Sequence, residues 1–180
     1  IPRPSGYLLS DIFPNFITDL SLRHRETKSD IEKRQKKAIF SVDQWCSEYE
    51  NRIQELGGIG FFLGGIGPDG HIAFNVRGSD HNSTTRILET NFETHAASAA
   101  DLGGIEISRN RLALTIGLST ITSNPDVTAI IFAAGEAKAG IVKDSLESNP
   151  EINYPATVLQ RVSGSRFYLT KGAAVLLDDM

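Results

Sequence analysis

The run "VTAIIFAAG" at residues 127–135 constrains the fold more than any other part of the sequence. It is apolar almost throughout and ends in alanine and glycine, which is typical of a strand buried inside a sheet. A helical pattern, "EAKAGIVKDSLES", follows at once. A second run, "IGFFLGGIG" at 59–67, also ends in glycines, and its apolar residues on both alternations predict burial on both faces.

Strand, glycine turn and helix therefore alternate along the chain. This order predicts an α/β fold with an open, mostly parallel, Rossmann-like sheet, helices on both faces, and ligands at the carboxyl ends of the strands. The apolar spacing from Val42 to Leu56 predicts an amphipathic helix, with Ser41 as its N-cap. The remaining expectations are a loop over 69–93, a strand entering a turn within 111–121, a short helix at 156–162 and a last strand within 165–177.

The charge pattern suggests a division of the chain near residue 40. Residues 1–40 are expected to form an N-terminal loop and a charged helical segment, and residues 41–180 an α/β domain. The chain starts without methionine and stops just after an apolar run, so we expect it to be part of a longer product.

Composition narrows the classes of partner. The 180 residues carry a net charge of −4, which argues against a broad nucleic-acid surface and favours a small-molecule ligand. No apolar stretch has the roughly 18 residues of a membrane span, so no membrane partner is expected. A single cysteine, Cys46, cannot form an internal disulfide, which favours a reducing, cytoplasmic location.

The stretch "GGIGPDGHIAFNV" at 64–76 carries the clearest functional signal. Glycines after a buried strand, such as Gly65 and Gly67, let backbone N–H groups approach an anion closely. A carboxylate beside an imidazole fixes its tautomer and raises its basicity, so Asp69 and His71 are candidates for proton transfer. The alternative is a histidine that only holds the loop together through hydrogen bonds.

Two other kinds of site are disfavoured. A dinucleotide site needs a helix straight after the glycines, and "HIAFNVRGSDHNSTT" is a poor helix candidate. A metal site is not expected either, because His71, His81 and His95 are irregularly spaced and no cysteine pair accompanies them.

The same stretch resembles the signature of the glucosamine-6-phosphate deaminase (isomerase) family, G-G-x-G-x-D-G-H-I-A-F-N-E. Looser similarity covers roughly residues 43 to 171, including "VTAIIFAAGEAKAGIVKDSLE". The related 6-phosphogluconolactonases carry G-x-D-G-H-T-A-S instead, so "HIAFN" resembles the deaminase form. The resemblance implies a divergent member or a fragment that lacks the N-terminal part of the family fold.

The resemblance also implies an activity. Family members convert glucosamine 6-phosphate to fructose 6-phosphate and ammonia, an aldose–ketose isomerisation of an amino-sugar phosphate that needs no cofactor or metal. Transferred by position, His71 resembles the ring-opening histidine, Asp69 its acid partner and Lys138 the phosphate-binding lysine. Arg86 resembles an arginine of an allosteric phosphate site, with a surface ion pair as the alternative. Positions implied to bind substrate are Gly65, Gly67, Asn75 and Lys138.

The sequence departs from the family pattern at Val76, where the signature has glutamate. Valine cannot transfer a proton, and general acid–base catalysis contributes about 10²- to 10⁴-fold in rate. Three functions therefore stay open: a deaminase-type enzyme, a non-catalytic phosphosugar-binding or regulatory module, and a lactonase-like hydrolase. A homo-oligomer and fusion to a deacetylase-like domain in a longer protein are further expectations from the resemblance.

Overall fold

The computed structural model describes residues 9–13, 17–108 and 111–178. Its strands are β1 (Phe61–Gly65), β2 (Arg86–Glu89), β3 (Leu112–Thr115), β4 (Thr128–Ala133) and β5 (Ser165–Leu169). Its α-helices are α1 (Leu9–Ile12), α2 (Asp30–Glu55), α3 (Phe92–Leu102), α4 (Ile105–Ser108), α5 (Leu118–Thr122) and α6 (Ala139–Glu147). Short 3-10 helices are η2 (Leu20–Arg23), η3 (Glu136–Lys138) and η4 (Pro155–Arg161).

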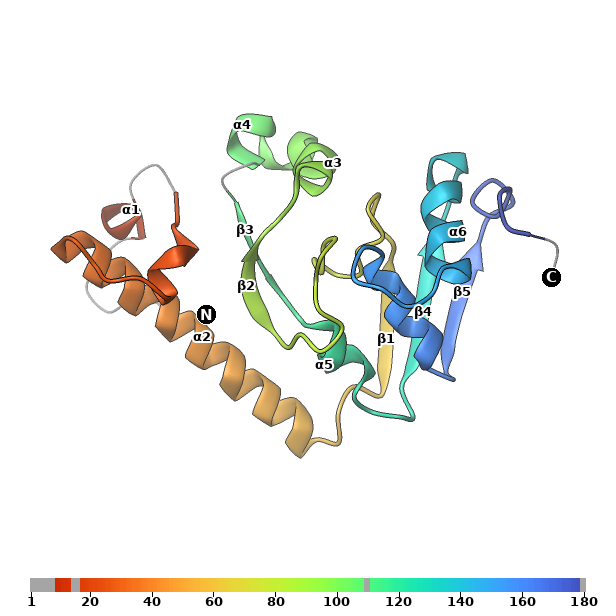
Figure 1. Cartoon of the computed structure of the whole chain (residues 1–180), viewed down its shortest axis with the longest axis horizontal. Helices are drawn as coiled ribbons and strands as arrows, with labels where there is room; N and C mark the ends of the chain where they lie inside the picture. Colours follow the sequence, from red (N-terminus) through yellow and green to blue (C-terminus); the bar gives the residue numbers. More distant parts are fainter. Residues whose placement is uncertain (1–8, 14–16, 109–110, 179–180) are drawn as a thin grey trace.

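Within the described residues, β1, β4 and β5 form a parallel sheet in the order β1–β4–β5 (Figure 1). The run at 127–135 supplies the central strand, as expected, and the run at 59–67 supplies β1. The expected open, mostly parallel α/β sheet with helices is therefore confirmed, but among the described residues the helices lie against one face of it and not on both faces as expected. The carboxyl ends of β1 and β4 lie side by side, which places the glycine-rich loop next to the start of η3 and α6.

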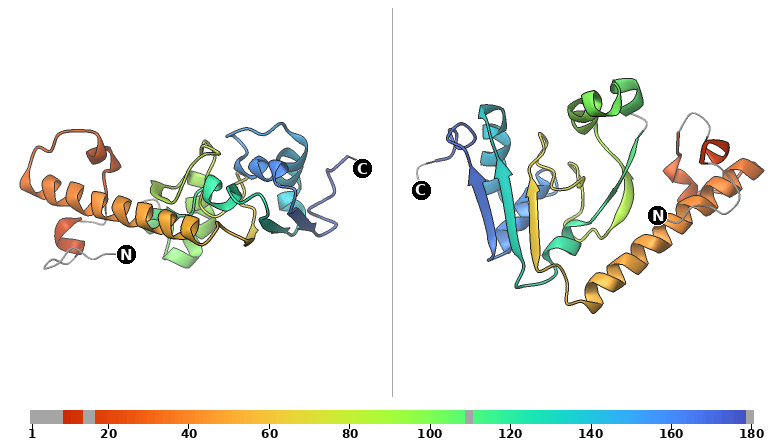
Figure 2. Two further views of the ribbon diagram at one scale, coloured as in Figure 1. Left: turned by 90° about the horizontal axis from the view of Figure 1, so that it is seen from below. Right: turned by 180° about the vertical axis from the view of Figure 1, so that it is seen from behind.

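The core lies between one face of this sheet and the helices α5, α6 and η4. Ile131 of β4, Ile121 of α5, Val142 of α6 and Leu159 of η4 are buried in one continuous cluster. The turned views show α6 and η4 on the same side of the sheet (Figure 2). Burying such side chains contributes about 1.5–3 kcal/mol each, so this layer is the main source of stability.

The opposite face corrects one expectation from the sequence. We expected both faces of the strand at 59–67 to be buried, but Phe61 is 58% exposed and Leu63 is 56% exposed. In the described part of the chain the helices cover the other face of the sheet, where β4 buries Ala129 and Ile131. An apolar pattern predicts which side chains should be buried, but it does not say whether a covering element is present.

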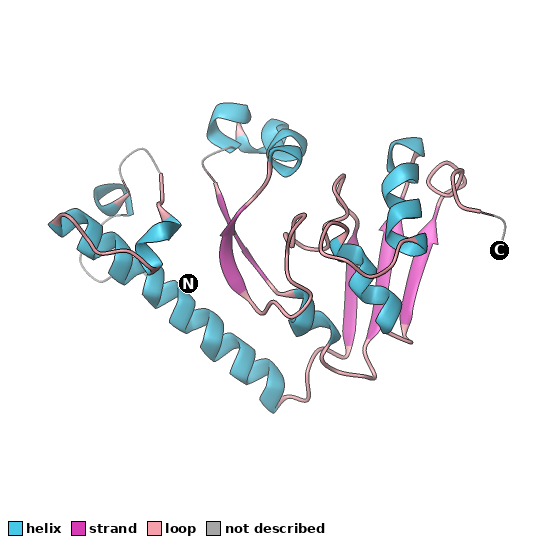
Figure 3. Ribbon diagram, in the orientation of Figure 1, coloured by secondary structure: helices cyan, strands magenta, loops and turns pink. Residues whose placement is uncertain are grey.

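A second small sheet was not expected from the sequence. β2 pairs antiparallel with β3, and α3 and α4 follow between them (Figure 3). The strand at 112–115 confirms the expectation for 111–121, but β2 lies inside a segment expected to be loop. Four residues of strand give too short a pattern to recognise without the partner strand.

The long helix α2 corrects the expected N-cap. Its cap is Ser29, whose hydroxyl accepts a hydrogen bond from the Glu32 N–H, whereas the Ser41 hydroxyl donates to the Lys37 carbonyl inside the helix. The helix therefore passes without a break through residue 40, and the division there remains a prediction. None of the helices in the described residues combines the length and apolar character that crossing a bilayer requires.

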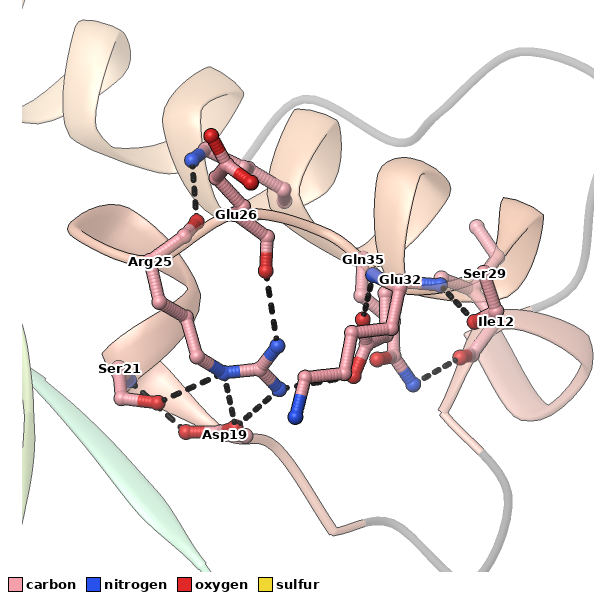
Figure 4. Close-up of polar contacts among 10 residues, drawn as sticks. Ile12, Asp19, Ser21, Arg25, Glu26, Ser29, Glu32 and Gln35 are labelled. Carbon is pink, nitrogen blue, oxygen red and sulfur yellow. Dashed lines mark hydrogen bonds and ion pairs between the residues drawn. The ribbon is translucent and has the colours of Figure 1, made fainter.

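Polar contacts hold the N-terminal residues against the start of α2. Arg25 donates to Asp19 at 2.7 Å and to Glu32 at 2.8 Å (Figure 4). Gln35 donates to the Ile12 carbonyl at 2.8 Å, which ties α1 to the same helix. These contacts lie at or near the surface of the helix.

Candidate functional site

A tight turn follows β1 and positions the candidate residues. The Gly67 N–H donates to the His71 carbonyl at 2.9 Å, and the Gly70 N–H donates to the Gly67 carbonyl at 3.1 Å. Gly70 has a φ of +82°, a conformation that side chains with a Cβ rarely adopt. Pro68 and Asp69 lie inside the turn that these hydrogen bonds close, shortly after the end of β1.

Gly67 provides space for the imidazole as well as a turn. A Cβ at this position would lie 2.0 Å from Cε1 of His71, so the ring packs directly over the glycine. This differs from the expected role of Gly67, because its N–H is used inside the turn and does not face an anion. Packing of the His71 ring gives a physical reason for glycine at position 67, and a substrate-binding role for Gly67 stays a prediction.

The ring of His71 reaches a hollow of about 410 Å³ at the end of β1. Gly65, Gly67 and Phe74 also line this hollow, together with the apolar side chains around them. The ring centroid of Phe74 lies 6.3 Å from that of His71. The imidazole is therefore part of an open cavity and is not sealed in the core.

The buried carboxylate of Asp69 contacts the Nδ1 side of the His71 ring. Asp69 is 1% exposed, and its Oδ1 lies 2.5 Å from Nδ1 of His71. Burial alone would raise the pKa of Asp69, but hydrogen bonds from His71, the Arg77 N–H and Asn91 hold it well below its usual value. An ionised acceptor at Nδ1 keeps the proton on that nitrogen, which leaves Nε2 as the nitrogen for a ligand.

Asn91 is a site residue that the sequence analysis missed. It caps α3 by accepting from the Thr94 N–H, and its amide donates to Oδ2 of Asp69 at 2.5 Å. Thr94 Oγ1 in turn lies 3.5 Å from Nδ1 of His71. An asparagine followed by an alanine-rich run was a usable helix-start signal.

Lys138 lies beside the same loop, as its position after β4 suggested. Its amine donates to the Ile66 carbonyl at 2.8 Å. Burial lowers the pKa of Lys138 below its usual value, and the negative charge of Asp69 opposes that shift. The structure thus brings Lys138 to the glycine turn that carries His71.

Asn75 and Arg86 form a separate structural pair. Asn75 is fully buried and donates to the carbonyls of Ile72 and Ile116, while its Oδ1 accepts from Arg86 at 2.9 Å. Its amide is therefore used to hold the loop, which differs from the expected contact with substrate. Arg86 also donates to Ser79 at 3.0 Å, and no carboxylate of a described residue forms an ion pair with it.

The other features of the site concern Val76 and metal ligands. The Val76 N–H donates to the Phe74 carbonyl at 2.9 Å, so its backbone continues the loop while its side chain supplies no charge. Across the described ranges, no group of three His, Cys, Asp or Glu side chains is arranged to hold a metal ion.

The chain is similar to known proteins, and each similarity covers only part of the known protein's length. The chain is 39% identical to a glucosamine-6-phosphate isomerase of Candida albicans over 121 residues, which is 67% of this chain and 48% of that protein. In general the chain spans about half the length of the curated relatives it matches. No protein-family model matches it.

Solved structures support the same fold. A monomeric glucosamine-6-phosphate deaminase superposes with a TM-score of 0.67 at 30% identity, covering 83% of this chain and 56% of that one. The 6-phosphogluconolactonase from Trypanosoma cruzi superposes with a TM-score of 0.53 at 20% identity, covering 73% of this chain and 50% of that one. The second likeness concerns the fold alone.

Proposed function

Because this chain belongs to the glucosamine-6-phosphate deaminase (isomerase) family and spans about half of its length, we propose that it forms the proton-transfer part of a sugar-phosphate site. The proposed reaction is aldose–ketose isomerisation of an amino-sugar phosphate with release of ammonia. The observation that carries the proposal is the buried Asp69 carboxylate bound to Nδ1 of His71, whose ring lines an open hollow.

In this proposal His71 moves a proton at the ring oxygen of the sugar. With Nδ1 held by Asp69, the neutral imidazole offers its lone pair at Nε2, and the imidazolium formed after proton uptake is stabilised by the adjacent charge. Lys138 would bind the phosphate from its place beside the glycine turn. To do so, its amine would exchange the Ile66 carbonyl for a phosphate oxygen, which is a stronger, charge-assisted acceptor.

Asn75 and Arg86 act in this proposal as positioning residues. Their hydrogen bond joins the end of the signature to β2, and the Asn75 amide fixes two carbonyls of the surrounding loops. The alternative phosphate role of Arg86 rests on the family resemblance; burial lowers the pKa of its guanidinium, and the nearby charge of Asp80 opposes that shift.

Val76 favours a second candidate, a phosphosugar-binding module without turnover. The family signature has an acid at this position, and a valine can neither take up a proton nor stabilise an imidazolium. If Asp69 and Asn91 do not compensate, the rate falls by the 10²- to 10⁴-fold typical of lost acid–base catalysis, and binding remains.

The test measures turnover and binding separately in the intact protein. We expect wild type to release ammonia from glucosamine 6-phosphate, and His71→Gln to lower kcat about 10²- to 10⁴-fold while calorimetry still detects binding. Val76→Glu should raise kcat. Saturable binding without ammonia release would favour the binding module, and hydrolysis of 6-phosphogluconolactone would favour the lactonase.

The location and assembly of the protein are also proposals. The one cysteine, Cys46, is buried and free, which supports a reducing, cytoplasmic compartment. Homo-oligomerisation and fusion to a deacetylase-like domain rest on the family resemblance and are tested by the mass of the intact protein in solution.

A further inference from the structure

Asn91 uses both ends of its side-chain amide. Its Oδ1 accepts from the Thr94 N–H at 3.1 Å as the N-cap of α3, and its Nδ2 donates to Oδ2 of Asp69 at 2.5 Å. Turning the amide over would place an oxygen against the carboxylate and an NH2 group against a backbone N–H, so both contacts require the same orientation. One side chain therefore joins the first turn of α3 to the acid that contacts His71.

The two oxygens of the Asp69 carboxylate have separate donors. Oδ1 faces Nδ1 of His71, whereas Oδ2 accepts from the Arg77 N–H at 2.9 Å and from Asn91. The donors on Oδ2 hold the plane of the carboxylate, and that plane determines where Oδ1 points. Because Asp69 is buried, water does not replace a donor that is lost. Among the described residues, removal of the Asn91 amide would leave only the Arg77 N–H to hold Oδ2.

A second residue of the same helical turn packs against the imidazole. Thr94 is buried, and its Oγ1 lies 3.5 Å from Nδ1 of His71, which is longer than an ordinary hydrogen bond. The first turn of α3 thus contacts both members of the acid–histidine pair. The orientation of the ring therefore depends on where α3 lies.

We propose that Asn91 is a positioning residue, which aligns Asp69 with Nδ1 of His71 and couples the orientation of the imidazole to the placement of α3. The inference rests on the proposed function, in which the ring moves a proton at the sugar through Nε2. Asn91 contacts the carboxylate and the helix cap, so it acts on the reaction through Asp69 and not on the substrate itself.

The test separates the amide donor from the helix cap. Serine and aspartate are about as good at an N-cap as asparagine, but neither offers an amide to Asp69. In the intact protein, Asn91→Ser should keep α3 folded, while the proton on Nδ1 of His71 exchanges faster with water and its NMR signal moves upfield. Asn91→Asp should disturb the ring more, because it places a second negative charge against Oδ2 of Asp69. A role limited to the cap predicts wild-type ring spectra in both variants.

The matched control is Ser29→Ala, which removes the N-cap of α2 and leaves Asp69 and its donors in place. It should lower the stability of the protein without changing the ring spectrum of His71. Kinetics give a second readout: in Asn91→Ser we expect kcat to fall with KM unchanged. The fall should be smaller than the roughly 10²- to 10⁴-fold that is lost with an acid–base group itself.

Unchanged ring spectra in both Asn91 variants would overturn the proposal, and so would an equal change of the spectrum in Ser29→Ala. A higher KM at unchanged kcat would also overturn it, since Asn91 would then act on the substrate. The spectra are recorded without substrate, so they test the role of Asn91 even if the wild type releases no ammonia. That last result would count against the proposed function alone.

Discussion

Two carboxylate networks in this chain are built from similar hydrogen bonds but lie in different surroundings. Asp69 is buried at the end of β1 and accepts from His71, Asn91 and a backbone N–H. Asp19 and Glu32 lie at the surface and share Arg25 (Figure 4). In both networks the pKa of the acid is lowered: bonds to Ser21 and Arg25 lower that of Asp19 to about 2, and bonds to Arg25 and the Lys28 N–H lower that of Glu32 to about 2.

The difference between them is the access of water. When a surface ion pair breaks, water solvates both groups, so the pair stabilises the fold little and salt screens it. When a buried acceptor such as Asp69 is lost, its hydrogen-bond donors stay unpaired, because water does not reach them to take its place. A lowered pKa in both networks therefore does not mean that both contribute equally to stability. Of the two, only the buried network can hold a ring in one orientation.

The largest effect is expected for Asp69→Asn, which keeps the shape of the side chain and removes its charge. The Arg77 N–H and the Asn91 amide would then share a neutral amide oxygen in place of the charged carboxylate oxygen that accepts both bonds now, so the free energy of unfolding should fall by about 1–3 kcal/mol. The new amide would donate to Nδ1 of His71 and move the imidazole proton to Nε2. Denaturant unfolding measures the first effect, and nitrogen NMR of the ring measures the second.

The control for this variant is Asp80→Asn, at an exposed carboxylate that accepts from the Asn82 N–H. It should change stability little. Since the pKa of folded Asp69 lies below the ordinary 3.8, its stabilising contribution is complete above that pH and is lost as pH falls through the folded value. The stability gap between wild type and Asp69→Asn should therefore be constant near neutral pH and narrow in acid. A gap that widens in acid would contradict the assignment.

A second effect is expected where the buried network meets the glycine turn. In Gly67→Ala the new methyl would overlap the His71 ring, which must move out of its place over the turn. Overpacking of this kind costs about 1–3 kcal/mol. Gly65→Ala is the matched control, since its Cβ would meet only the Phe132 carbonyl at 3.7 Å. Equal stability and equal His71 NMR shifts in the two variants would show that ring packing does not require glycine at 67.

The sequence predicted the buried network better than its surroundings. A strand followed by glycines was recognisable from local pattern alone, and Asp69 and His71 lie two residues apart in the resulting turn, so local geometry brings them together. Asn91 comes from the start of α3, and its contact with Asp69 depends on how α3 packs against the loop. Such a contact between distant segments leaves no periodic signal in the chain.

The errors at the surface have the same origin. Ser29 and Glu32 form a helix-start pattern, but the charge pattern predicts only a loop and a charged helical segment over residues 1–40, and the apolar spacing after Ser41 places the N-cap there. The exposure of Phe61 and Leu63 could not be predicted either, because burial depends on the element that covers the strand. Local sequence pattern predicts helices and strands well, but it predicts poorly which elements pack against them.

The smallest effect is expected for Arg25→Ala, which removes the centre of the surface network while the Ser29 cap of α2 stays in place. Water solvates Asp19 and Glu32 once the guanidinium is gone, so the midpoint of thermal unfolding should shift only slightly, and less again at high salt. The same substitution should return the pKa values of both acids toward their ordinary values, which carboxyl NMR titration measures. A loss of stability as large as that of Asp69→Asn, and insensitive to salt, would mean that the surface network is not solvated in the way its exposure indicates.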